Sequence, residues 1–169
     1  HVASLTGSAE ATTTVFRYID WLVTVPLQIV EFYLILAAVT IVPLMLFWRL
    51  LGAALVMLVF GFMGEANLGD PMLMFLIGMA GWFYIIYEVF AGEASKLSVS
   101  SANRGAQFAF NNLRLILTLG WAIYPIGYYL GMESGGSDTA NIVYNLADLV
   151  NKAAFGLVIW AGAKMDSED

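Results

Sequence analysis

Five polar or ionisable residues recur at helical spacing in the first apolar segment, RYIDWLVTVPLQIVE. They are separated by 3, 4, 4 and 3 residues, so on an α-helix they share one stripe: Arg17, Asp20, Thr24, Gln28 and Glu31. At 1.5 Å per residue this stripe is roughly 21 Å long, which is most of the hydrocarbon thickness of a bilayer. Titratable groups aligned across a membrane indicate a path for protons or ions.

A second pair of charges lies in the last apolar segment, NIVYNLADLVNKAAFGLVIW, where Asp148 and Lys152 are four residues apart on one helix face. Counted along the helix, the lysine lies roughly 16 Å from the start of its segment. The same count places Asp20 at roughly 9 Å and Glu31 at roughly 25 Å along the first segment. We therefore expect the amine to lie between an outer acid that stays ionised and an inner acid, Glu31, that stays protonated in apolar surroundings. The alternative is a structural ion pair that only holds two helices together.

Aromatic residues accompany these charges. The fourth apolar segment contains WAIYP, with Trp121, Tyr124 and Pro125, and Trp21 follows Asp20 directly. Rings at this spacing are typical of core packing or of an interfacial belt. Trp121 lies too deep in its segment for a belt and level with the lysine, which favours a slot for a flat, apolar ligand attached to the amine.

The elements that must position these residues follow from the composition. Of the 169 residues, 60% are hydrophobic and 12% are charged, against roughly 25% charged in soluble domains. We expect an all-α, transmembrane helical bundle with five spans, each close to the length that crosses a bilayer. The predicted spans are 15–42, 46–66, 72–91, 107–130 and 141–163. Residues 1–14 are interpreted as an extracellular connector and residues 164–169 as a cytoplasmic tail.

The positive residues predict how the bundle is oriented. If the spans alternate, one side of the membrane receives all five basic residues outside the two charged helix faces: Arg49, Lys96, Arg104, Arg114 and Lys164. The opposite loops carry acids and no lysine or arginine. By the positive-inside rule, the basic side is cytoplasmic. The sequence therefore predicts a multi-pass protein of the cell (inner) membrane with its C-terminus in the cytoplasm.

Several classes of function are excluded. There is no cysteine, and the single histidine is His1, so the sequence predicts no metal site. Basic residues do not cluster with interleaved aromatics, so we expect no nucleic acid partner.

Four long motifs resemble the microbial rhodopsins, and most closely the blue-absorbing proteorhodopsins. RYIDWLVTVPLQIVEFYLIL, LVMLVFGFMGEA, GWAIYPIGY and NLADLVNKAAFGLVIW are similar to the third, fourth, sixth and seventh helices of that family, in order. The family has seven helices. The resemblance therefore implies an N-terminally incomplete fragment with five of the seven.

The resemblance also implies a cofactor and roles for single residues. Lys152 would carry all-trans retinal as a Schiff base, and Asp20 with Asp148 would form its counterion. Asp20 would be the primary proton acceptor, Glu31 the cytoplasmic proton donor, and Arg17 the residue that couples the counterion to proton release. Eight further residues match retinal-pocket positions of the family: Trp21, Thr24, Met57, Gly61, Trp82, Trp121, Tyr124 and Pro125.

The triplet Asp20, Thr24 and Glu31 is similar to the pattern of the proton-pumping proteorhodopsins, and Gln28 stands at the position where glutamine implies blue absorption. The resemblance thus predicts a light-driven outward proton pump, a transporter and not an enzyme. Its partners would be protons, the lipid bilayer and other copies of itself in a homo-oligomer. The alternative is a sensory rhodopsin that signals through a partner protein; a donor at Glu31 argues against it, because a sensor gains nothing from fast reprotonation.

Overall fold

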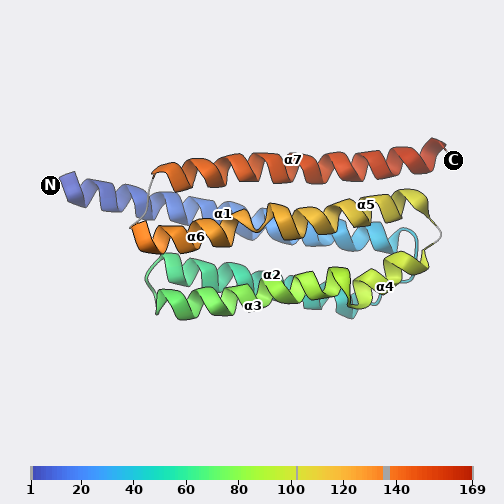
Figure 1. The fold of residues 1–169 in the computed structure, drawn as a ribbon, viewed down its shortest axis with the longest axis horizontal. Helices are drawn as coiled ribbons and strands as arrows, with labels where there is room; N and C mark the ends of the chain where they lie inside the picture. Colours follow the sequence, from blue (N-terminus) through green and yellow to red (C-terminus); the bar gives the residue numbers. More distant parts are fainter. Residues whose placement is uncertain (1, 102, 135–137, 169) are drawn as a thin grey trace.

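The computed structural model describes the backbone of residues 2–101, 103–134 and 138–168, and the side chains of residues 13–101, 103–130 and 141–167. Within these ranges the chain is helical and contains no strand (Figure 1). The elements are α1 (Val2–Ala37), α2 (Leu44–Glu65), α3 (Pro71–Phe90), α4 (Glu93–Ser100), α5 (Arg104–Leu115), the π-helical turn η1 (Ile116–Gly120), α6 (Ile123–Ser134) and α7 (Asp138–Glu168).

The helices run along one common axis, and some follow one another end to end. In Figure 1, α3 leads into α4, and α5 leads through η1 into α6. In the described part of the chain, five stretches are long and apolar enough to cross a membrane: Thr13–Ala37, Leu44–Glu65, Pro71–Ser100, Arg104–Leu130 and Asn141–Ser167. The predicted all-helical bundle is therefore confirmed.

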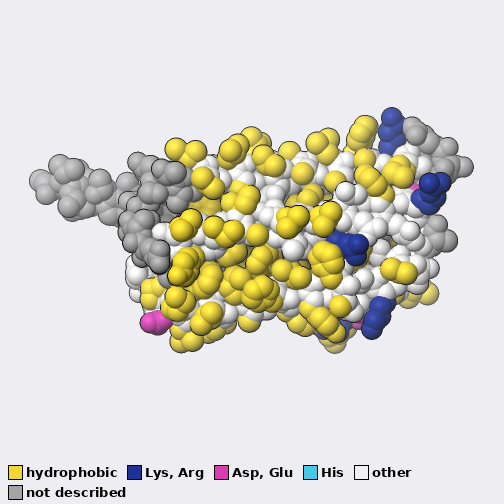
Figure 2. Space-filling model, in the orientation of Figure 1, with side chains coloured by type: hydrophobic (Ala, Val, Ile, Leu, Met, Phe, Trp, Pro, Cys, Tyr) yellow, Lys and Arg dark blue, Asp and Glu magenta, His cyan; other side chains and the backbone are white. Residues whose placement is uncertain are grey.

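The outside of the bundle is apolar over most of its length. Large side chains such as Val23 on α1 and Leu149 on α7 are 57% and 68% exposed, which is typical of a surface that faces lipid. Figure 2 shows hydrophobic side chains over the middle of the visible face. Lysine and arginine side chains gather toward the end of the bundle where α7 ends.

Close packing fixes the arrangement of the helices around the site. The buried face of α1 includes Ile29, Phe32 and Leu36, and the rings of Phe32 and Phe110 on α5 lie 5.1 Å apart. Helices α2 and α3 approach closely at Gly81, where a Cβ atom would lie 2.6 Å from the carbonyl oxygen of Ala53. Glycine at this position therefore allows the two backbones to touch.

The first helix differs in length from its predicted span. It begins at Val2, so residues 2–14, predicted as a connector, continue the helix. It ends at Ala37, five residues before the predicted end. The reason lies in VTIV before Pro43: β-branched residues and the residue preceding a proline both disfavour helix.

Three other predicted boundaries also differ. The loop after the third span contains α4, whose first N–H, that of Glu93, is capped by the carboxylate of Glu88 at 2.9 Å. Helix α5 begins three residues early because the side chain of Asn103 accepts the N–H of Ala106 at 2.6 Å, as an N-cap does. At the other end of the chain, α7 continues through most of the predicted tail, to Glu168.

Candidate functional site

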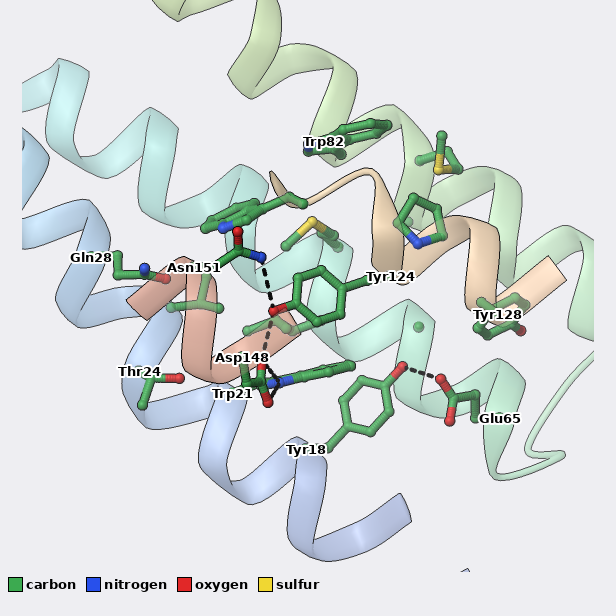
Figure 3. A pocket seen from close by; sticks show the side chains of 18 of the residues that line it. Tyr18, Trp21, Thr24, Gln28, Glu65, Trp82, Tyr124, Tyr128, Asp148 and Asn151 are labelled. Atoms are coloured by element: carbon green, nitrogen blue, oxygen red, sulfur yellow. Dashed lines mark hydrogen bonds between the residues drawn. The ribbon is translucent and has the colours of Figure 1, made fainter. Parts of the chain in front are cut away.

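The predicted ligand slot is a cavity inside the bundle, lined by α1, α2, α3, α6, α7 and the segment around η1 (Figure 3). It encloses about 800 Å³ of space that protein atoms do not fill, part of it open to the surroundings. Eleven predicted site residues line it: Trp21, Thr24, Gln28, Met57, Gly61, Trp82, Trp121, Tyr124, Pro125, Asp148 and Lys152.

The amine of Lys152 contacts two acids, Asp20 from the first helix and Asp148 from its own helix face. Its Nζ atom lies 2.5 Å from Oδ2 of Asp20 on α1 and 3.8 Å from Oδ2 of Asp148 on α7. Asp148 is one turn before the lysine on the same helix, while Asp20 approaches from a different helix. The shorter distance makes Asp20 the more strongly coupled partner.

Asp148 is held in place by neutral donors. The indole Nε1 of Trp21 donates to both carboxylate oxygens, at 3.1 and 3.0 Å. The hydroxyl of Tyr124 donates to Oδ1 at 2.6 Å. These three hydrogen bonds fix the orientation of the Asp148 carboxylate beside the lysine.

Aromatic rings form the walls of the slot. Trp21, Trp82 and Trp121 are 7%, 8% and 4% exposed, and the rings of Trp21 and Tyr124 meet edge to face with centroids 5.0 Å apart. Trp82 is oriented by a hydrogen bond from its Nε1 to the carbonyl of Leu117, at 2.9 Å. Both Trp121 and Trp21 are thus too deeply buried for the alternative of an interfacial belt.

Two polar side chains of α1 also line the slot. Gln28 is 7% exposed, and its Nε2 atom is buried without a hydrogen-bond partner among the described residues. A buried amide donor without a partner is costly, so this atom suits a site whose occupant lies beside it. The Thr24 hydroxyl donates to the carbonyl of Asp20 at 2.9 Å.

Arg17 lies at one end of the cavity and pairs with a residue that the sequence reasoning did not select. Its guanidinium forms a salt bridge with Glu65 at the end of α2 and donates to Oδ1 of Asn141 at 2.8 Å. It also lies over the ring of Tyr144, 4.5 Å from the centroid. The hydroxyl of Tyr18 donates to the same carboxylate, to Oε1 of Glu65, at 3.0 Å.

Glu31 lies outside the lining of the cavity. It is exposed on α1, eleven residues after Asp20, which corresponds to roughly 16 Å along the helix axis. The structure thus brings Asp20, Asp148 and Lys152 together and leaves the predicted donor farther along the same helix.

Nine residues line the cavity without having been selected from the sequence: Tyr18, Val25, Leu58, Glu65, Phe75, Gly78, Met79, Tyr128 and Asn151. Most are apolar and indistinguishable from ordinary core positions in a sequence. Two carried a usable signal. Asn151 is an amide within an apolar span, directly before Lys152, and Glu65 is the acid at the end of the second span.

The fold and this site define the class of protein. The family model of bacteriorhodopsin-like proteins matches residues 2–165, and the chain belongs to this family. The predicted resemblance to the microbial rhodopsins is confirmed. So is the predicted architecture, a multi-pass transmembrane helical bundle.

Similar proteins make the relationship more specific. The chain is 54% identical over 162 residues to the blue-light absorbing proteorhodopsin of Gamma-proteobacterium Hot 75m4, covering 94% of this chain and 64% of that protein. It is 54% identical over 159 residues to the green-light absorbing proteorhodopsin of Gamma-proteobacterium EBAC31A08, covering 92% and 64%. The chain thus spans 64% of the length of both relatives.

Solved structures agree with this assignment. The crystal structure of blue light-absorbing proteorhodopsin from Med12 is similar with a TM-score of 0.76 and 57% identity, over 90% of this chain and 68% of that one. The crystal structure of Exiguobacterium sibiricum rhodopsin is similar with a TM-score of 0.82 and 36% identity, over 92% of this chain and 74% of that one. The structure of xanthorhodopsin, described as a light-driven ion pump with dual chromophore, is similar with a TM-score of 0.75 and 28% identity. The match covers 91% of this chain and 64% of that one.

Proposed function

We propose that this protein is a light-driven outward proton pump that uses retinal bound to Lys152. The observation that carries the proposal is the ion pair at the cavity: Nζ of Lys152 lies 2.5 Å from Oδ2 of Asp20. An amine with a carboxylate at hydrogen-bond distance, beside an aromatic slot, provides an attachment point and a proton acceptor together. The class of protein would then be a transporter and not an enzyme.

The residues present fit retinal. The slot is walled by Trp21, Trp82 and Trp121 and reaches the lysine, as a flat, apolar aldehyde requires. The amide of Gln28 lines the slot, so its dipole would act on the conjugated chain of the ligand. When bound as a Schiff base in the all-trans form, retinal would supply absorption of visible light and an isomerisation that changes the proton affinity of the attached nitrogen. Gln28 would set the absorption in the blue.

The chain's own residues account for the proton steps. Asp20 would accept the proton from the nitrogen of Lys152 at its Oδ2 atom, because this oxygen is the nearest base. Asp148 would remain ionised as the second counterion, since Trp21 and Tyr124 donate to it. Glu31, farther along α1 toward its C-terminal end, would return a proton to this nitrogen. Arg17 would couple Asp20 to release through its position at the other end of the cavity.

The direction of transport follows from the orientation of the bundle. The basic end, where α7 ends, would face the cytoplasm by the positive-inside rule (Figure 2). Glu31 lies nearer to this end along α1 than Asp20 does, so the net movement would be from cytoplasm to exterior across the cell membrane. The homo-oligomer implied by the resemblance stays a prediction.

The pump is tested by illuminating cells that carry the complete gene product containing this chain, supplied with retinal, in an unbuffered suspension. We expect light-driven acidification of the medium that a protonophore abolishes. A coloured protein that cycles in light without any change of external pH would support the sensory rhodopsin instead. Alkalinisation would contradict the proposed direction.

A further inference from the structure

The π-helical turn beside the cavity leaves two backbone carbonyls without their usual donors. In an α-helix the carbonyl of residue i accepts the N–H of residue i+4. In η1, however, the N–H of Trp121 donates to Ile116 at 3.0 Å and not to Leu117. Pro125 has no N–H for the carbonyl of Trp121, and this carbonyl takes the N–H of Tyr124 at 3.1 Å. In a regular α-helix the N–H of Tyr124 would donate to the carbonyl of Gly120, so this carbonyl loses its usual backbone donor.

Side chains from two neighbouring helices replace the missing donors. Trp82 on α3 donates its Nε1 to the carbonyl of Leu117 at 2.9 Å. Asn151 on α7 donates its Nδ2 to the carbonyl of Gly120, also at 2.9 Å. Glycine is required there, since a Cβ atom on Gly120 would lie 2.3 Å from Oδ1 of Asn151. The amide is thus fixed in place by a carbonyl that can only accept.

The same amide also reaches the counterion. Nδ2 of Asn151 has a second hydrogen and lies 3.3 Å from the hydroxyl oxygen of Tyr124. That hydroxyl lies 2.6 Å from Oδ1 of Asp148 (Figure 3). A phenol has one hydrogen to give. The amide nitrogen of Asn151 cannot accept this hydrogen, so the hydroxyl of Tyr124 donates it to Asp148, and the hydrogen bond from Asn151 holds the hydroxyl in place.

We propose that Asn151 is a positioning residue for proton transfer, acting through the hydroxyl of Tyr124 on Asp148. This inference rests on the proposed function. Asn151 holds the hydroxyl of Tyr124, and this hydroxyl keeps the carboxylate of Asp148 hydrogen-bonded. The proton leaving the nitrogen of Lys152 is thereby directed to Asp20. The hydrogen bond to the carbonyl of Gly120 only holds the amide in place for this contact with Tyr124.

The alternative role of Asn151 is purely structural, namely to satisfy the carbonyl of Gly120. A double-mutant cycle separates the two roles. Asn151→Leu keeps the approximate shape of the side chain and removes both donated hydrogen bonds, and Tyr124→Phe removes only the hydroxyl. If Asn151 acts through that hydroxyl, its effect on the chromophore must vanish in the Tyr124→Phe background. A structural effect through Gly120 would persist there.

The measurements are the dark absorption maximum and the time constant of light-driven proton transfer to Asp20, in the complete gene product with retinal. We expect Asn151→Leu to shift the maximum and to change the time constant about two- to tenfold, as the loss of one hydrogen bond implies. The double variant should match Tyr124→Phe alone in both. Additive effects, or an unshifted Asn151→Leu pigment, would overturn the proposal.

Two features keep the outcome interpretable. If Asn151→Leu does not fold, Asn151→Ala removes the same donors without adding bulk, and its effect must vanish in the same background. The dark absorption maximum does not depend on pumping. If the two substitutions shift the dark absorption maximum additively, the proposed role of Asn151 is overturned, and the proposed pump function is unaffected. A parent that absorbs but transfers no proton contradicts the proposed function, and the dark cycle still decides whether Asn151 acts on Asp148.

Discussion

At the scale of single residues, one nitrogen organises the site. Nζ of Lys152 has a carboxylate from another helix at 2.5 Å and one from its own helix at 3.8 Å. Their surroundings differ: the side chain of Asp148 is 17% exposed and accepts from Trp21 and Tyr124, while that of Asp20 is 47% exposed. Two acids in such different environments beside one amine are suited to different tasks.

Replacing the lysine should remove the chromophore. We expect Lys152→Ala to abolish visible absorbance after retinal is added, because no other lysine lines the cavity within the described residues. The matched control is Lys96→Ala, which removes an exposed amine on α4 and should leave the spectrum unchanged. Absorbance spectra of the purified proteins measure both. A full visible band in Lys152→Ala would show that retinal is held elsewhere.

Replacing the proposed donor should slow the recovery of the photocycle without shifting the absorption maximum. Glu31 is exposed on α1 and outside the cavity lining, so Glu31→Gln should leave the absorption maximum near that of the parent. Without the carboxylic acid, return of a proton to the nitrogen of Lys152 should slow by about a hundredfold. Flash photolysis measures this recovery. An unchanged recovery would mean that the proton comes from another group.

How much of the site a sequence can predict depends on the spacing of its residues. The helical rise alone placed the amine of Lys152 between Asp20 and Glu31 in depth, and in the structure this amine contacts Asp20 and Asp148. It could not predict the Arg17–Glu65 pair, because that contact depends on how far α1 and α2 are offset along the bundle axis. Asn151 was missed for a similar reason: its acceptor exists only because the helix turns irregularly at η1.

At the scale of elements, the close approach of α2 and α3 determines one wall of the cavity. Gly81→Ala would place a methyl group 2.6 Å from a backbone oxygen of α2, so the helices must separate. We expect a loss of about 1–3 kcal/mol from overpacking and a lower midpoint for thermal bleaching of the pigment.

Gly52→Ala on α2 is the matched control for Gly81→Ala. Its Cβ atom would meet nothing within 4 Å, and alanine favours helix over glycine by up to about 1 kcal/mol. The midpoint should therefore stay or rise. Equal losses in the two variants would show that packing between α2 and α3 is not the cause.

The sequence predicts the helices whose positions follow from periodicity and length. It does not predict the elements that depend on single hydrogen bonds. The five apolar spans are present in the described chain. Helix α4 was predicted as loop because its stability depends on the buried Glu88, which is 2% exposed and caps it. The turn η1 was also not predicted, since Pro125 indicates an irregularity but not which carbonyls find new donors.

At the scale of the whole molecule, the charged face formed by α1 and α7 is open. Asp20 and Lys152 have side chains 47% and 32% exposed, which is costly in contact with lipid. We therefore expect residues 1–169 expressed alone to form little pigment. Co-expression with the segment of the 54% identical blue-light absorbing proteorhodopsin that this chain does not match should raise the yield severalfold. Visible absorbance per unit of purified protein measures this, and equal yields would show that the open face needs no cover.

Outward pumping by the whole molecule depends on the transfer of a proton from the nitrogen of Lys152 to Asp20. Light-induced infrared difference spectra of the complete gene product with retinal test it directly. We predict a C=O stretching band of a newly protonated carboxylic acid that disappears in Asp20→Asn and persists in Asp148→Asn. A band that survives in Asp20→Asn and is lost in Asp148→Asn would contradict it.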